Sequence, residues 1–126
     1  MILKLLAVAA GGSVGAGLRY IIFYYFERNH ASVFPWATLI VNLLGSLLIG
    51  FLWGYFDRYF VTTGIRLLIF VGLLGSFTTY STYAFDAFSL FRDGEFKMLA
   101  GYILGSNVLG IGLAFAGFYL SKYVPF

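Results

Sequence analysis

Residues 65–91 of the chain read IRLLIFVGLLGSFTTYSTYAFDAFSLF, an apolar stretch with a polar middle. A helix that crosses a bilayer core about 30 Å thick needs roughly 20 mostly apolar residues, and this stretch is long enough. From Ser76 to Thr82, however, five of seven residues carry aliphatic hydroxyls. β-branched threonines and glycine weaken a helix, and hydroxyls compete for backbone hydrogen bonds. The sequence therefore predicts a transmembrane helix with a break near Gly75–Thr79, close to mid-membrane.

A break at this depth has two interpretations. Non-helical backbone inside a membrane is tolerated only where protein buries it or a polar cavity receives it. Hydroxyls that simply bond to their own preceding helical turn would be structural, and this explains one or two such residues well. Tyr80 and Tyr83 add two phenols, one turn apart on the same helical face. Because so many hydroxyl-bearing residues gather here, we favour a functional site.

The composition of the whole chain is that of a membrane protein. Of 126 residues, 61% are apolar, 8 are basic and 5 are acidic, and the mean hydropathy is +0.92. A soluble domain usually carries about 25% charged residues. These values argue against a soluble enzyme, a disordered tail and a nucleic-acid binder, whose basic residues would cluster into a patch. Since the chain contains no cysteine, a disulfide scaffold, a thiolate metal site and a cysteine nucleophile are excluded.

Three further apolar stretches accompany the first. The four predicted spans are about 3–26, 36–56, 65–91 and 98–120, and charged or turn-forming clusters separate them. The fold class expected is therefore an all-α membrane protein with four transmembrane helices. All of residues 1–126 belong to this single four-span domain.

Basic residues are divided almost evenly between the two predicted faces of the membrane. The orientation of a membrane protein normally follows an excess of Lys and Arg in its cytoplasmic loops. One face has Lys4, Arg58, Arg66 and Lys122, and the other has Arg28, Arg92 and Lys97, with Arg19 near them. So little bias indicates insertion in both orientations and hence an antiparallel dimer. The alternative is that Lys4 and Arg19 alone fix one orientation.

Polar side chains also lie inside the other spans. Thr38 and Asn42 share one face of the second span, and Tyr102 and Ser106 share one face of the fourth, with Asn107 beside them. An intramembrane charge is by default a functional or structural anchor. Arg19 has that role or extends to the interface, and the two interpretations are equally good. Asp86 is the only acid inside a span. It is placed to meet a vestibule or an oppositely charged partner.

These groups support ion solvation better than catalysis. The only histidine, His30, falls in a predicted loop, and no glycine-rich phosphate loop with its lysine is present. The chain is therefore not expected to be an enzyme. Hydroxyls, amides and aromatic ring edges can solvate a small ion that has lost its water, as selectivity filters do. Arg19 and the scarcity of membrane acids favour an anion.

Three segments together resemble the fluoride channel family known as Fluc or CrcB. The first is GGSVGAGLRY (residues 11–20), similar to the glycine-rich first helix of the family, which ends in arginine. The second, TLIVNLLGS (38–46), matches the signature Thr-Leu-x-Val-Asn-x-x-Gly. The third, GLLGSFTTYSTY (72–83), resembles Gly-x-x-Gly-Gly-x-Thr-Thr-Phe-Ser-Thr-Phe. The resemblance extends over nearly the whole chain.

The resemblance implies an antiparallel, dual-topology homodimer in the bacterial plasma (inner) membrane. Each dimer would hold two fluoride pores and one structural sodium ion at the dimer interface. Its implied role is passive export of cytoplasmic fluoride, which gives fluoride resistance. Gly75 and Thr78 would offer backbone carbonyls to the sodium ion, and Asp86 resembles the vestibule glutamate of the family. The fluoride pore would be formed by Thr38, Asn42, Tyr80, Ser81, Thr82, Tyr83, Tyr102 and Ser106.

Two departures from the family pattern concern the pore. Tyr80 and Tyr83 replace the phenylalanine pair, and Ser76 replaces the second glycine of the central motif. A phenylalanine ring offers an anion its positive edge. A tyrosine keeps edge hydrogens and adds a hydroxyl, which either donates to the ion or points away to bond Asn42 or a backbone carbonyl. We expect the pore geometry and the conduction rate to depend on this choice.

Two other classes of protein compete with a fluoride channel. A small four-helix dual-topology exporter of cationic compounds needs an acid in its first span for proton exchange, but this span has Arg19 and no acid before Glu27. A purely structural membrane subunit would explain the glycines. It would leave Asn42 and the hydroxyl cluster without a purpose.

Overall fold

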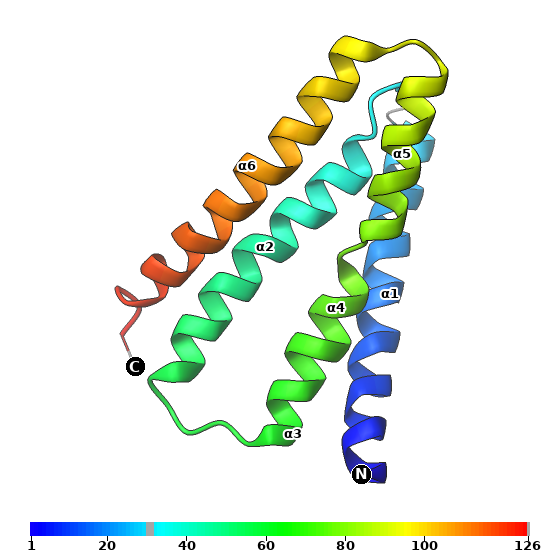
Figure 1. Cartoon of the computed structure of the whole chain (residues 1–126). Helices are drawn as coiled ribbons and strands as arrows, with labels where there is room; N and C mark the ends of the chain where they lie inside the picture. Colours follow the sequence, from blue (N-terminus) through cyan, green and yellow to red (C-terminus); the bar gives the residue numbers. More distant parts are fainter. Residues whose placement is uncertain (30–31, 126) are drawn as a thin grey trace.

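The computed structural model describes residues 1–29 and 32–125, so the loop predicted at His30 lies outside the described residues. Every regular element within these ranges is a helix (Figure 1). The elements are α1 (Ile2–Asn29), α2 (Trp36–Asp57), α3 (Thr63–Arg66), the π-helix η1 (Leu67–Leu74), α4 (Gly75–Phe77), α5 (Tyr80–Arg92) and α6 (Phe96–Ser121).

Four helical runs of the described chain are long and apolar enough to cross a membrane. They are Ile2–Asn29, Trp36–Asp57, Thr63–Arg92 and Phe96–Ser121. This confirms the prediction of an all-helical chain with four such helices, whose ends extend past the predicted bounds by a turn or less. The third run is assembled from α3, η1, α4 and α5.

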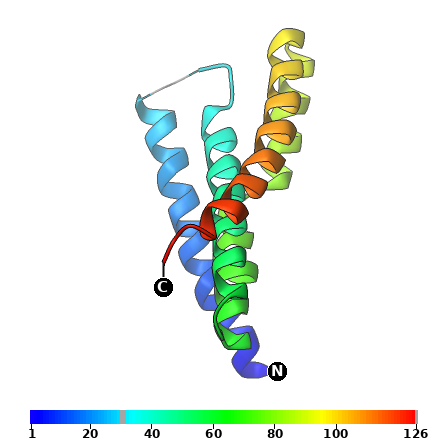
Figure 2. The same cartoon turned by 90° about the vertical axis from the view of Figure 1, so that its left-hand side faces the viewer.

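The helices alternate in direction and pack in two groups. α2 lies along α6, whereas α1 lies along η1 and α4, and α5 packs against the first half of α6 (Figures 1 and 2). The N-terminus and the α2–α3 connection lie at the lower end of Figure 1, and the α5–α6 connection lies at the upper end. Arg58 and Arg66 are therefore at the end opposite Arg92 and Lys97.

Sequence signals explain where these helices begin and end. α2 starts directly after Pro35, where the missing backbone N–H of proline is harmless. α5 ends at Arg92, and Gly94 in the following turn has a left-handed φ of 76°, which suits glycine. The N–H of Glu95 then donates to Leu90 O at 2.9 Å, which closes the turn before α6.

Glycines let neighbouring helices approach until their backbones touch. A Cβ atom added at Gly50 would collide with the carbonyl oxygen of Ala114, and one added at Gly117 would collide with that of Leu47. α1 meets η1 in the same way at Gly11, against Leu68 O. Close backbone contact matters in lipid, where no hydrophobic effect drives helices together. Packing thus explains the glycines at these contacts, whereas Gly101 and Gly105 of α6 meet no neighbouring atom within 4 Å.

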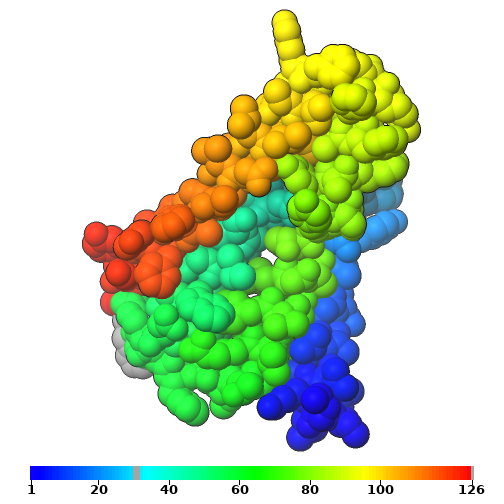
Figure 3. Space-filling view, in the orientation of Figure 1, coloured from blue at the N-terminus to red at the C-terminus, as the bar shows by residue number. Residues whose placement is uncertain are grey.

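The backbone between α4 and α5 is extended for two residues. Thr78 has φ −80° and ψ 158°, and Thr79 has φ −146° and ψ 122°. α5 then begins at Tyr80, with the Thr79 side chain accepting a hydrogen bond from the Thr82 N–H. On the surface, a hollow opens where α2 meets this segment (Figure 3). Its volume is about 340 Å³, and its lining includes Asn42, Gly75 and Tyr80.

Candidate functional site

Asn42 holds the extended segment with both ends of its amide. Its Nδ2 donates to Thr79 O at 3.0 Å, and its Oδ1 accepts from Thr79 N at 2.8 Å. In a continuous helix, the N–H of Thr79 would donate to Gly75 O, four residues earlier. Asn42 of α2 therefore replaces a helical hydrogen bond, and it fixes the non-helical geometry of the next span.

The hydroxyl cluster of residues 76–82 divides into two sets. Thr78 Oγ1 donates to Leu74 O at 3.0 Å, and Ser76 Oγ lies 2.7 Å from Gly72 O and 2.9 Å from Gly12 O. These two hydroxyls satisfy nearby backbone, as the structural interpretation expects. Thr79 Oγ1 contacts Thr82 Oγ1 at 3.1 Å, and Ser81 is exposed. Three of the hydroxyls thus form a separate group at the start of α5.

Asp86 collects two hydroxyl donors on one carboxylate oxygen. Thr38 Oγ1 donates to Asp86 Oδ2 at 2.7 Å, and Tyr102 OH donates to the same atom at 3.1 Å. Thr38 is 3% exposed and Tyr102 is fully buried. The Asp86 side chain therefore links α2, α5 and α6 by hydrogen bonds.

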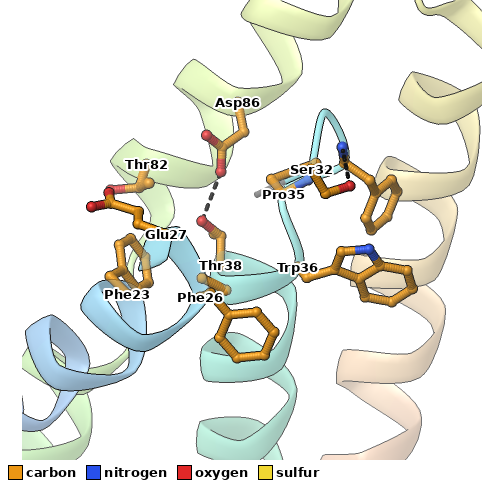
Figure 4. A pocket seen from close by; sticks show the side chains of 11 residues that line it. Phe23, Phe26, Glu27, Ser32, Pro35, Trp36, Thr38, Thr82 and Asp86 are labelled. Atoms are coloured by element: carbon orange, nitrogen blue, oxygen red, sulfur yellow. Dashed lines mark hydrogen bonds between the residues drawn. The ribbon is translucent and has the colours of Figure 1, made fainter. Parts of the chain in front are cut away.

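A cavity of about 470 Å³ opens beside this carboxylate. Asp86 reaches across it toward Thr38, while Glu27 and Thr82 lie on one side (Figure 4). Apolar rings and Pro35 complete the wall. The cavity lies between the end of α1 and the start of α2, and Asp86 is part of its lining.

The two tyrosines that replace the phenylalanine pair lie next to this cluster. The ring of Tyr83 is 5.2 Å from that of Tyr102 and 5.7 Å from that of Tyr80 between centroids. Tyr80 is 79% exposed. The hydroxyl of Tyr83 accepts a hydrogen bond from Asn107 Nδ2 at 3.0 Å. Of the partners considered for a pore phenol, neither Asn42 nor a backbone carbonyl is the one found here.

Ser106 lies one turn beyond Tyr102 on α6 and has a different environment from the other hydroxyls. Its Oγ is buried, and it has no hydrogen-bond partner among the described residues. Buried polar atoms in proteins are nearly always paired, so an exception calls for an explanation such as a ligand. Ser106 therefore has hydrogen-bonding capacity that no described residue uses.

Arg19 extends across to the third span. Its Nε donates to Ser76 O at 3.0 Å, so the guanidinium joins α1 to α4. The side chain thus acts as an anchor between two helices at this depth. Because Ser76 precedes the extended residues by two positions, Arg19 also fixes the helix that leads into them.

The structure brings most of the predicted site residues into two neighbouring groups. One group is a row joined by hydrogen bonds and by the tilted contact between two rings, and the cavity adjoins it; its members are Thr38, Asp86, Tyr102 and Tyr83. Asn42, Gly75, Thr78 and Tyr80 line the hollow near α2. Sequence reasoning did not give a role to Asn107, and no local pattern could have done so, because its partner is 24 residues away.

Fold and site together define a four-span helical membrane protein with hydroxyl and aromatic groups gathered around one acid, Asp86, inside its spans. Residues 6–118 match the sequence model of the family described as CrcB-like protein, Camphor Resistance (CrcB). The chain belongs to this family.

Curated relatives are similar to the chain over most of their length. A protein of Aquifex aeolicus named fluoride-specific ion channel FluC is 43% identical over 92% of this chain and 94% of its own. The protein of that name in Parabacteroides distasonis is 38% identical over 97% and 95%. Fluoride-specific ion channel FluC 1 of Nitrobacter hamburgensis is 42% identical over 90% of both chains.

Proposed function

We propose that the chain forms a fluoride-selective ion channel that passively exports fluoride across the bacterial inner membrane. The buried, unpartnered Oγ of Ser106 carries this proposal, because Ser106 lies one turn beyond Tyr102 on α6 and its hydroxyl is free to donate to an ion. The family and its FluC-named relatives support fluoride as that ion.

The donors of the row suit an anion that has shed its water. Hydrogen bonds to a charged partner are about twice as strong as neutral ones. The hydroxyls of Thr38 and Tyr102 already converge on Asp86 Oδ2, and each has only one hydrogen to donate. A fluoride ion would therefore be solvated by the unpartnered hydroxyl of Ser106 and by aromatic ring edges. Selective conduction then requires that each site hold the ion weakly enough to release it.

We also propose that the extended residues Thr78 and Thr79 form a mid-membrane break that binds a structural sodium ion. The N–H of Thr79 donates to Asn42, and that of Thr82 donates to Thr79 Oγ1. Gly75 O and Thr78 O therefore lose the donors they would have in a continuous helix. Carbonyl oxygens released in this way fit a small cation, which would hold the segment by ligation.

The proposed assembly is an antiparallel homodimer of copies in opposite orientations. Tyr80 and Gly75 are exposed on the single chain, at the hollow beside α2. A polar hollow at this depth cannot face lipid without cost, because lipid offers no hydrogen bonds. A second copy would cover it and would contribute its own Gly75 and Thr78 carbonyls.

Ion efflux from liposomes tests the proposed channel. Vesicles that contain the purified protein should release fluoride much faster than chloride, measured with electrodes selective for each ion. Vesicles without protein provide the control for leakage. Fluoride release no faster than chloride release would exclude a fluoride-selective channel.

Labelling of a single introduced cysteine tests the dual topology. Because the chain has no cysteine, Leu3→Cys adds the one reactive thiol and keeps the neighbouring basic residue Lys4. In cells, a membrane-impermeant maleimide should label about half of the molecules, and the rest should react only after the membrane is opened. Labelling from one side alone would contradict the antiparallel assembly.

A further inference from the structure

Both N–H groups of the Asn107 side-chain amide donate hydrogen bonds within the protein. Its Nδ2 lies 2.9 Å from Ile103 O and 3.0 Å from the hydroxyl oxygen of Tyr83. The first bond is to its own preceding turn and would be enough to satisfy an amide on a helix. The second bond joins α6 to α5. Its acceptor, Tyr83, occupies a position where the Fluc or CrcB family has phenylalanine. The amide therefore does more than satisfy its own helix.

An amide donor in this position controls where the phenol proton points. A tyrosine hydroxyl can both accept and donate, and its hydrogen rotates to suit its partners. When an N–H occupies one side of the oxygen, the hydroxyl hydrogen turns to the other side. Accepting a hydrogen bond also polarises the O–H group and strengthens it as a donor. Asn107 thus makes the Tyr83 phenol a donor directed away from the Asn107 amide.

The surroundings of Tyr83 place this donor beside the proposed ion path. Its ring packs on Tyr102, whose hydroxyl belongs to the Asp86 cluster. The unpartnered Ser106 Oγ is on the residue that precedes Asn107, one turn beyond Tyr102. Among the described residues, the hydroxyl of Tyr83 is not recorded as donating to any group, so its proton is available to an ion.

We propose that Asn107 is a positioning residue that holds the Tyr83 phenol as a hydrogen-bond donor to the permeating fluoride. The inference rests on the proposed channel function and adds to it a determinant specific to this chain. Without Asn107, the hydroxyl hydrogen of Tyr83 rotates freely and is no longer directed toward the ion.

A double-mutant cycle on Asn107 and Tyr83 tests this proposal. Asn107→Leu removes the amide at similar volume, and Tyr83→Phe removes the phenol oxygen. Initial fluoride efflux is measured over a series of fluoride concentrations, which gives a half-saturating concentration and a maximal rate. Each single variant should raise the half-saturating concentration about tenfold, as expected for one lost hydrogen bond to an ion. The maximal rate should not fall, because the ion is released more easily.

The double variant separates positioning from a direct effect. If Asn107 acts through the phenol, Asn107→Leu added to Tyr83→Phe produces no further change, and the total shift remains about tenfold. Independent contributions would multiply to about a hundredfold, and this outcome would overturn the proposal. A lower maximal rate at an unchanged half-saturating concentration would also overturn it, since it indicates only damage to the fold.

Two additional variants keep the result interpretable. Tyr119→Phe removes a phenol that lies on α6 rather than α5. It should leave the half-saturating concentration and the maximal rate unchanged. If Asn107→Leu does not reconstitute, Asn107→Ser replaces it, because the shorter side chain cannot reach Tyr83. The Tyr83→Phe variant also tests the inference by itself. An unchanged half-saturating concentration in Tyr83→Phe refutes the inference. The wild-type ratio of fluoride to chloride efflux reports separately on the proposed function.

Discussion

Asn42→Leu is expected to reduce fluoride efflux at least about a hundredfold. Asn42 supplies both the donor and the acceptor that hold Thr79 in its extended conformation. Leaving two buried backbone groups without these partners costs about 1–3 kcal/mol each. Without Asn42, the N–H of Thr79 can pair again with Gly75 O, which restores a regular helix. A loss of about 3 kcal/mol lowers the population of the conducting geometry about a hundredfold.

The control for this variant is Ile40→Leu, an apolar exchange at an exposed position of the same helix. It should leave efflux unchanged. Both variants should elute from size-exclusion chromatography at the wild-type volume and retain the same helical circular dichroism. Efflux of Asn42→Leu within a factor of two of wild type would mean that Asn42 neither contacts the ion nor supports the path.

Ser106→Ala should reduce fluoride efflux about thirtyfold without lowering stability. The Oγ of Ser106 is buried and lacks a partner among the described residues, so its removal breaks no bond within the chain. Removal of an unsatisfied buried hydroxyl is neutral or stabilising. A hydroxyl that donates to a passing anion contributes about 1.5–3 kcal/mol, equivalent to about a tenfold to hundredfold effect on rate. We therefore expect Ser106→Ala to lower the fluoride efflux rate while the stability of the protein is unchanged or higher.

Ser13→Ala provides the comparison for Ser106→Ala. The hydroxyl of Ser13 donates to Ala9 O in its own helix at 2.8 Å and is exposed. Its removal should affect neither efflux nor the thermal midpoint of unfolding in detergent. If Ser106→Ala also conducts at the wild-type rate, Ser106 is not an ion ligand, and its lack of a partner needs another explanation.

The sequence could predict the helices because a bilayer imposes their length and composition. Four apolar stretches of about 20 residues have few alternatives in a chain of this size. Local chemistry likewise drew attention to residues 76–82, because hydroxyls, threonine and glycine weaken a helix together. These are properties of neighbouring residues, and they need no knowledge of how the helices pack.

The pairing of the polar groups could not be predicted, because it depends on how the helices face one another. The family resemblance places Asn42 in the pore, but its bonds to Thr79 depend on the register between α2 and the third span. The sequence is equally consistent with Arg19 extending to the membrane interface and with Arg19 anchoring two helices. Its contact with Ser76 O depends on how α1 packs against α4. The bond between Asn107 and Tyr83 similarly joins residues that no local pattern connects.

The zero-current voltage of single channels in a planar bilayer tests the central claim most directly. With fluoride on one side and chloride on the other, a passive channel selective for fluoride should pass current that reverses far toward the equilibrium potential of fluoride. The reversal should follow that potential when the fluoride gradient is changed and should ignore changes in chloride. Reversal near zero voltage, or reversal that follows chloride, would contradict the account.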